Sequence, residues 1–250
     1  MKQHSTVTGD DNASTCGING TKNPLAGQNG LIYTSSGDTD FAVLTFNYEN
    51  KEGKENVQKL NTLRNTISSY LFEYLQGFHI PTYFISKRSE TEMSVKKTQR
   101  IPLIIRIYNS ANGQLTKRFG LKEGMNIEFP ILEHYYTLNA RGNSWVNEYH
   151  IYGLGILIPE EFKQMNRIAT KVNAVLRGLC DRRQLSLPEL CLTFGRFKGQ
   201  MLLCGELSPA TCHFLDASGE NKNKRDRFAL AQDDAVESLF ELSDRLLVKA

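Results

Sequence analysis

The chain has 250 residues, 40% of them hydrophobic, and its 30 Lys and Arg nearly balance 27 Asp and Glu. A formal charge of +3, with the two signs interspersed along the chain, does not favour nucleic acid as a partner. The five cysteines form no CxxC pair, and no apolar run reaches the length of a membrane span. We therefore expect a reduced, cytoplasmic protein with one compact core and no membrane partner.

The first half predicts a leader, a hairpin and a long helix. Residues 1–26 are rich in Ser, Thr, Gly, Asn and Asp and lack periodicity, which is typical of a mobile leader. From Val57 to Tyr74 the apolar residues recur at helical spacing, and Gly77 ends the pattern. Alternating or continuous apolar runs predict strands at residues 30–33, 41–46, 81–85 and 101–108.

The second half predicts a loop-rich segment and then two helices around one strand. Gly120, Gly124 and Pro130 mark the loop-rich part. Pro159 opens a helix that ends near Arg182-Arg183, because proline and acidic residues favour the first turn and basic residues the last. A strand at 201–207 and a helix capped by Asp233-Asp234 follow. Without a regular βαβ alternation, this order predicts an α+β fold with mostly antiparallel sheets.

Few residues indicate chemistry on their own, and the sequence has no GxxxxGK[ST], GxGxxG or HExxH motif. Glu206 follows an apolar strand, and a buried carboxylate must be paired, protonated or bound to a cation. It is therefore a candidate Mg²⁺ or nucleotide ligand, and the alternative is a strand end that faces water. His150, two residues after Glu148, is a weaker candidate, because a single histidine is more often structural.

Several short segments in register together resemble the SAICAR synthetase family from about Gly27 to Leu247. They are Leu71-Phe72-Glu73-Tyr74-Leu75, His79-Ile80-Pro81-Thr82, Asn109 to Gly113 with Lys117 to Leu121, Asn147-Glu148-Tyr149-His150, Phe194-Gly195-Arg196, Glu206-Leu207-Ser208-Pro209 and Asp226-Arg227-Phe228. The resemblance implies a two-lobed α+β fold with an ATP-type cleft. It divides the chain after the leader into an N-terminal lobe at 27–108, on the nucleotide side, and a C-terminal lobe at 109–250.

The family joins aspartate to a carboxyaminoimidazole ribotide, and it uses ATP and Mg²⁺ to activate the ribotide carboxylate. The resemblance therefore implies ATP and Mg²⁺ as cofactors if this chemistry is retained. It places cofactor binding at Lys96, Glu206 and Asp226, with Glu206 on the metal. It places substrate binding at Tyr108, Asn109, Gly113, Gln114, Lys117, Ser208, His213 and Arg227, and acid–base chemistry at Glu206, His150 and His213.

The departures from the family pattern fall on charged ligands. The glycine loop at 27–33 lacks the two lysines that help to hold ATP phosphates. Tyr108, Gln114 and His213 stand where the family has an arginine, a serine and an arginine for the ribotide phosphate, and Gly205 replaces the aspartate before Glu206. Losing three charge-assisted hydrogen bonds of about 1.5–3 kcal/mol each would lower ribotide affinity by orders of magnitude.

Three hypotheses remain open. The first is a diverged enzyme that acts on a purine-like nucleotide or nucleoside in specialised metabolism of the pentostatin and coformycin type, with the ligase chemistry altered or lost. The second is a genuine SAICAR synthetase with unusual ligands, and the third is a non-catalytic binding or regulatory protein. The expected partner is a small nucleotide or nucleoside-like substrate, and in the third hypothesis the protein pairs with another enzyme. A homo-oligomer is compatible with the sequence.

Overall fold

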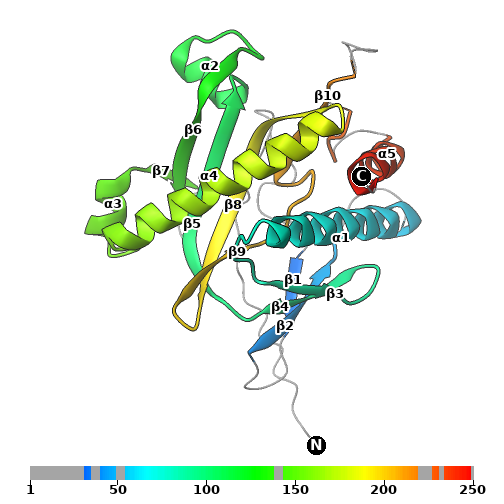
Figure 1. Cartoon of the computed structure of the whole chain (residues 1–250), viewed down its shortest axis with the longest axis horizontal. Coiled ribbons are helices and arrows are strands. Elements are labelled where there is room, and N and C mark those ends of the chain that lie inside the picture. Colours follow the sequence, from blue (N-terminus) through cyan, green and yellow to red (C-terminus); the bar gives the residue numbers. More distant parts are fainter. Residues whose placement is uncertain are drawn as a thin grey trace, which may run out of the picture.

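The computed structural model describes residues 31–34, 40–48, 54–137, 143–218, 227–230 and 234–248. The expected leader lies outside this part of the chain. The described residues form two antiparallel sheets with helices packed against them (Figure 1). The predicted α+β class with antiparallel sheets is confirmed, whereas the division into lobes at 108/109 stays a prediction.

The smaller sheet has the order β1-β2-β4-β3, and every neighbouring pair is antiparallel. The predicted hairpin pairs β1 with β2, and its expected turn at 36–38 lies outside the described residues. Alternate residues of β2 are buried, which matches the pleat of a strand with one covered face. The strands are β1 (Leu31–Thr34), β2 (Phe41–Phe46), β3 (Phe84–Lys87) and β4 (Glu92–Lys96).

Helix α1 (Lys54–Gly77) packs on the smaller sheet and, along its other side, on α5 (Ala235–Leu247) (Figure 1). Its apolar positions recur at three- and four-residue steps, as the sequence predicted, and Leu60, Ile67 and Leu71 are fully buried. Arg64 shares this stripe and is also fully buried. The helix therefore presents a charged group inside the protein.

The larger sheet has the order β10-β8-β5-β6-β7, and β9 also pairs with β8. Its strands are β5 (Gln99–Ser110), β6 (Asn126–Tyr136), β7 (Ser144–Val146), β8 (Leu185–Phe197), β9 (Gln200–Cys204) and β10 (Cys212–Asp216). The prediction of a loop around Pro130 was wrong, because Pro130 lies within β6. Pro130 lies where the register of β5 and β6 shifts, so its missing N–H removes no bond from the regular ladder.

Helix α4 (Pro159–Arg182) crosses one face of the larger sheet, and its buried stripe includes Met165, Val172 and Leu176 (Figure 1). The predicted helix is confirmed, with Pro159 in its first turn. Two short helices, α2 (Gly113–Phe119) and α3 (Glu148–Gly153), follow β5 and β7. None of the helices in the described segments is both long enough and apolar enough to span a bilayer.

The position of the loop at 205–211 follows from the way in which three strands pair with β8. One edge of β8 pairs with β5, whereas β9 and β10 pair with opposite halves of its other edge. The connection at 205–211 therefore passes the point where β9 and β10 part. Gly205 begins it with φ +80°, a conformation that L side chains rarely adopt.

Candidate functional site

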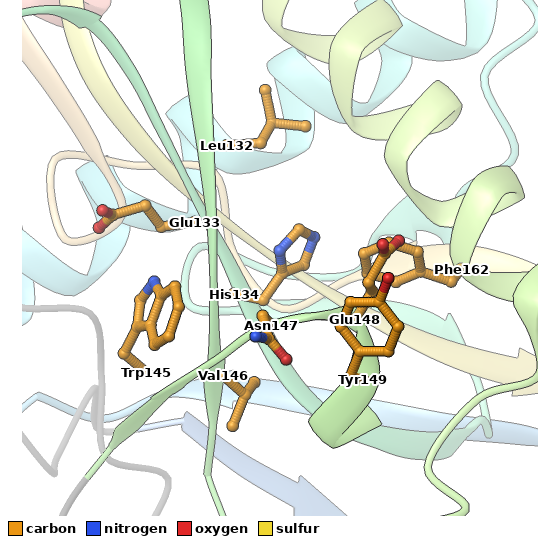
Figure 2. A pocket seen from close by; sticks show the side chains of 9 residues that line it. All are labelled: Leu132, Glu133, His134, Trp145, Val146, Asn147, Glu148, Tyr149 and Phe162. Carbon is orange, nitrogen blue, oxygen red and sulfur yellow. The ribbon is translucent and has the colours of Figure 1, made fainter. Parts of the chain in front are cut away.

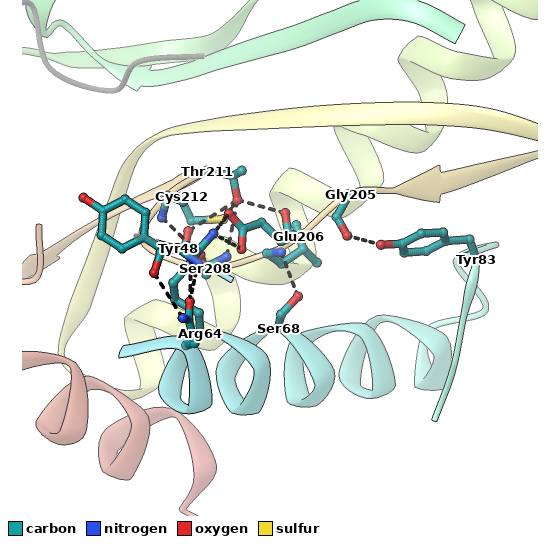
Figure 3. A network of polar contacts seen from close by, with 12 residues as sticks. Tyr48, Arg64, Ser68, Tyr83, Gly205, Glu206, Ser208, Thr211 and Cys212 are labelled. Carbon is teal, nitrogen blue, oxygen red and sulfur yellow. Dashed lines mark hydrogen bonds and ion pairs between the residues drawn. The ribbon is translucent and has the colours of Figure 1, made fainter. Parts of the chain in front are cut away.

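The connection at 205–211 delivers Glu206 into the protein interior, where it meets Arg64 of α1 (Figure 3). Arg64 Nη2 donates to both carboxylate oxygens of Glu206, at 2.7 Å and 2.9 Å. Neither side chain is exposed. Of the two alternatives that the sequence left open for Glu206, the structure has the buried one, and the partner of Glu206 is a guanidinium of the same chain.

Aromatic rings surround the guanidinium. Its carbon lies 5.5 Å from the ring centre of Phe46 and 5.6 Å from that of Tyr48. Asn61 connects Tyr48 to α1, because its side chain accepts from the Tyr48 N–H at 2.9 Å and donates to the Tyr48 carbonyl at 3.2 Å. These contacts place Arg64 in a pocket that favours a cation.

Further hydrogen bonds fix the backbone around Glu206 (Figure 3). The Ser68 hydroxyl accepts from the N–H of Leu207 at 3.0 Å, and the Tyr83 hydroxyl donates to the carbonyl of Gly205. Thr211 donates to the carbonyl of Glu206 at 2.9 Å. The loop is therefore attached to α1 and to the chain next to the smaller sheet, and the carboxylate has little freedom to turn elsewhere.

The residues around Glu206 do not fit a Mg²⁺ ion. Burial raises the pKa of Glu206, and the neighbouring Arg64 counteracts part of that rise. A magnesium site needs open carboxylate oxygens, and both oxygens of Glu206 already accept from Arg64. Within the described segments, no three His, Cys, Asp or Glu side chains are grouped as metal ligands. The expected metal role of Glu206 therefore has no support in the geometry.

The second polar cluster lies on the larger sheet, on the face opposite α4. The register places Glu189 of β8 between Tyr108 of β5 and His213 of β10. Arg106 of β5 points to the same face, because it lies two residues before Tyr108, and its Nε is 2.5 Å from Glu189 Oε1. The structure thus brings two expected substrate residues, Tyr108 and His213, around one buried carboxylate.

Electrostatics in this cluster are dominated by burial. Tyr108 is 1% exposed and Glu189 3%. Burial raises the pKa of the Tyr108 hydroxyl, although Arg106 acts in the opposite direction. Burial likewise raises the pKa of Glu189, and Arg106 and His213 oppose the rise. Tyr108 therefore stays a neutral hydrogen-bonding group.

The cluster continues along β6. Glu133 accepts from Arg118 of α2 at 2.7 Å and from the Tyr135 hydroxyl at 2.6 Å. The guanidinium of Arg106 lies 5.6 Å from the ring centre of Tyr108 and 6.0 Å from that of Tyr135. Rings, carboxylates and guanidiniums therefore alternate across this face.

Asn109 lies on the other face of β5 and is used in packing. Its amide exchanges two 2.8 Å hydrogen bonds with the amide of Asn173 in α4, and it also donates to the carbonyl of Leu187 at 2.8 Å. Gly113 and Lys117 lie at the beginning and on the exposed side of α2. The side chain of Gln114 is outside the described structure.

The remaining expected site residues lie apart. His150 is exposed and closes a capping box with Asn147 at the beginning of α3. The Ser208 hydroxyl accepts from the N–H of Ala210 at 3.1 Å. Lys96, at the end of β4, has its Nζ 5.8 Å from the ring centre of Phe197.

Arg227 ties β10 to α5. It donates to Asp216 at 2.8 Å and pairs with Glu241, and Arg245 donates to the other oxygen of Asp216 at 3.0 Å. These four side chains form one ion-pair network at the end of the larger sheet. Asp226, the expected cofactor ligand next to Arg227, lies outside the described residues.

A hollow of about 320 Å³ lies elsewhere, at the edge where β6, β7 and α3 meet (Figure 2). His134, Glu148, Tyr149 and Phe162 are among its lining residues, and none of the expected site residues lines it. His134 Nε2 is 2.8 Å from the side-chain oxygen of Asn166, and burial lowers the pKa of His134. The histidine is thus already used in packing β6 against α4.

The partners of the buried carboxylates were not predicted from the sequence. Arg64 could have been found, because it lies four residues after Leu60 and three before Ile67, on the apolar stripe of α1. Arg106 stood out as a single charge in the run 101–108, and such a charge requires a partner. Glu189 carried no signal, because β8 itself was not predicted.

Comparisons with known proteins agree on one family. A family model described as SAICAR synthetase matches residues 44–234. A phosphoribosylaminoimidazole-succinocarboxamide synthase of Clostridium perfringens (strain SM101 / Type A) is 34% identical over 197 residues, which are 79% of this chain and 84% of the relative. The crystal structure of the Ehrlichia chaffeensis enzyme of the same name superposes with TM-score 0.78 at 27% identity, over 89% of this chain and 97% of the other. A solved SAICAR synthetase (Type-2) in complex with ADP gives TM-score 0.78 at 27% identity, over 88% and 96%.

Proposed function

Because the chain belongs to the SAICAR synthetase family, we propose that it is a diverged enzyme acting on a purine-like or imidazole nucleotide or nucleoside. In this proposal the magnesium-dependent ligase step of its relatives is altered or lost. The site is the region between the Arg64–Glu206 pair and the polar face of the larger sheet. Cytoplasmic nucleoside metabolism of the antibiotic type is the setting that we propose for it.

The observation that carries the proposal is the bidentate ion pair between Arg64 and Glu206, buried on both sides. Glu206 is the carboxylate that the resemblance assigns to Mg²⁺, and its oxygens are held by a guanidinium instead. Gly205 supports the same conclusion. A Cβ at this position would lie 2.6 Å from Thr193 Oγ1, so the aspartate of the family pattern has no room there.

A nucleotide without a bound metal fits the proposal better than a nucleotide with one. The solved relative with ADP supports nucleotide binding by this fold, and we propose that an adenine nucleotide binds here more weakly. A genuine SAICAR synthetase is the second candidate, favoured by 34% identity over most of the chain.

Calorimetry with ATP, with and without Mg²⁺, followed by an assay for ADP, separates these candidates. The assay mixture contains carboxyaminoimidazole ribotide and aspartate, and the Clostridium perfringens relative serves as the active control. We expect no ADP from this chain and no increase in ATP affinity on adding Mg²⁺. ADP formation near the rate of the control would establish the second candidate. Absence of binding to every nucleotide and nucleoside would leave the non-catalytic binding protein.

A further inference from the structure

The hollow between β6, β7 and α3 is lined by aromatic side chains that reach solvent (Figure 2). Tyr149 is 75% exposed and Trp145 51%, although both are large. Exposed rings beside a concave surface are typical of a small-molecule site. None of the residues expected to hold substrate or cofactor lines this hollow, so a ligand here would be separate from the proposed function.

The pairing of β6 explains where the hollow lies. On one edge of β6, β5 is in register from Ile131 to Tyr136. On the other edge, β7 is in register only with residues 134–136. After Val146 the chain leaves the sheet and enters α3. This departure leaves a gap beside residues 132 and 133 of β6, and Phe162 of α4 forms part of its wall.

Aromatic rings form much of this wall. The ring centres of His134 and Phe162 lie 4.8 Å apart, and Tyr152 stands edge-on to Phe162 at 5.8 Å. Trp145 and Tyr149 are the exposed part of the wall (Figure 2). The faces of tryptophan, tyrosine and phenylalanine rings carry a negative electrostatic potential that attracts an organic cation.

Two carboxylates beside these rings have no cationic partner among the described residues. Glu148 lines the hollow. Burial raises the pKa of the Tyr152 hydroxyl, and the negative charges of Glu148 and Glu160 raise it further, so both carboxylates lie near this hydroxyl. Neither carboxylate forms an ion pair within the described segments, whereas the neighbouring Glu161 pairs with Arg196 at 2.7 Å.

The other titratable groups at the hollow add no positive charge. Burial lowers the pKa of His134, which keeps its ring neutral near pH 7. Glu133 pairs with Arg118 at 2.7 Å, so these two charges cancel. His150 uses its Nδ1 to accept from the N–H of Asn147 at 3.2 Å. None of the 9 lining residues is a lysine or an arginine, and the hollow is therefore electronegative.

This combination suits an ammonium group better than a metal ion or an anion. A metal ion needs further oxygen or nitrogen ligands, and no three such side chains are grouped in the described part of the chain. An anion would meet carboxylates without a lysine or arginine. An ammonium group can donate to a carboxylate and also lie against aromatic faces. The volume of about 320 Å³ is near the lower limit for small-molecule sites and admits a molecule of few heavy atoms.

We propose that the hollow binds a small organic amine in its protonated form, with the ammonium group held by Glu148 and by the rings of Trp145 and Tyr149. The proposal does not depend on the proposed function, whose test uses ATP, the ribotide and aspartate.

The first test uses Trp145 as the reporter, because it is the single tryptophan of the chain. The full chain is titrated with butylamine at about pH 8 and constant ionic strength, where an ordinary histidine is neutral and the amine is still protonated. We expect a saturable change in fluorescence with a millimolar dissociation constant. 1-Butanol, which has the same alkyl chain without the charge, should bind about tenfold more weakly. A linear change equal to that of free N-acetyltryptophanamide, or equal binding of the alcohol, would overturn the proposal.

The second test removes one feature of the hollow at a time. Glu148→Gln should weaken butylamine binding about fivefold, and Tyr149→Leu about threefold. The matched control is Glu123→Gln, which removes the same charge from an exposed position outside the hollow and should leave the affinity unchanged. A folded Glu148→Gln protein with unchanged affinity would overturn the proposal and leave the proposed function standing. If this variant does not fold, Tyr149→Leu and the comparison of amine and alcohol on the unmodified chain decide.

Discussion

The Arg64–Glu206 pair predicts an unusually large loss of stability when one partner is removed. Arg64→Met keeps the length of the side chain and deletes the guanidinium, which leaves Glu206 buried without its cation. Both side chains are 0% exposed and share two hydrogen bonds of 2.7 Å and 2.9 Å. Loss of one member of such a pair costs about 3–5 kcal/mol of unfolding free energy. Contacts of the guanidinium with Phe46 and Tyr48 place the expected value in the upper half of that range.

Urea unfolding followed by circular dichroism measures this cost, and a double-mutant cycle isolates the pair. Glu206→Gln alone should also destabilise strongly, because Arg64 then lacks its carboxylate. The double variant should recover about 2–4 kcal/mol relative to the sum of the singles, since no unpaired charge remains.

Lys59→Met is the control on the same helix. Lys59 pairs with Glu55 at 2.7 Å, but both side chains are more than half exposed, so the unfolding midpoint should hardly move. If Arg64→Met behaved like Lys59→Met, the buried pair would not be what attaches the loop at 205–211 to α1.

Three further predictions concern other polar contacts. Asn109→Ala should lower the unfolding free energy by at least about 2 kcal/mol in urea titrations, because Asn173 loses its reciprocal amide partner, and replacing both by Leu should recover most of the loss. Gly205→Ala should cost about 1–3 kcal/mol in the same assay, from its φ of +80° and the contact with Thr193, and Thr193→Ala should relieve part of the cost. Burial alone would raise the pKa of Asp216, but hydrogen bonds from Arg245 and Ser218 hold it well below its usual range. That stabilisation is present above the unfolded pKa of about 3.9 and is lost as pH falls from about 4 through the folded pKa. The urea midpoint of Asp216→Asn should therefore change less than that of the unmodified chain over this acid range.

Controls and contradicting results follow for the Asn109, Gly205 and Asp216 predictions. Gly153→Ala serves for Gly205, because no atom lies within 4 Å of a Cβ built there. Equal costs for the two glycines would contradict the steric argument. An Asn109→Ala protein of normal stability that had lost ligand affinity would return Asn109 to the substrate site. Parallel acid profiles for Asp216→Asn and the unmodified chain would show that the network around Arg245 does not set the acid limit.

The long helices could be predicted because their apolar periodicity is local. The stripe of α1 and the Pro159 start of α4 are both visible in the sequence, and both were confirmed. Strand β8 could not be recognised in the same way, because it is buried on both faces over much of its length and contains Pro188 and Glu189 within an apolar run. Its identity depends on β5, which is far away in the sequence.

The site was predictable only for residues whose environment is local. The apolar strand before Glu206 made burial one of two alternatives, whereas its pairing with Arg64 joins residues 142 positions apart and left no local signal. The expected substrate residues Tyr108 and His213 both lie beside Glu189 of β8, which separates them in the sheet. The spacing of these three residues along the chain does not predict that they lie side by side in the sheet.

The contact between Gly205 and Thr193 also couples the residue types that these two positions can accept. Restoring the family's aspartate at 205 alone would strain the backbone and force a side chain against Thr193 Oγ1. Changing Thr193 alone removes its hydrogen bond to the carbonyl of Cys204, at 3.1 Å. Each change made alone therefore weakens the local structure of the loop. A side chain larger than glycine at 205 therefore requires a compensating change at 193, and the two positions form one packing unit.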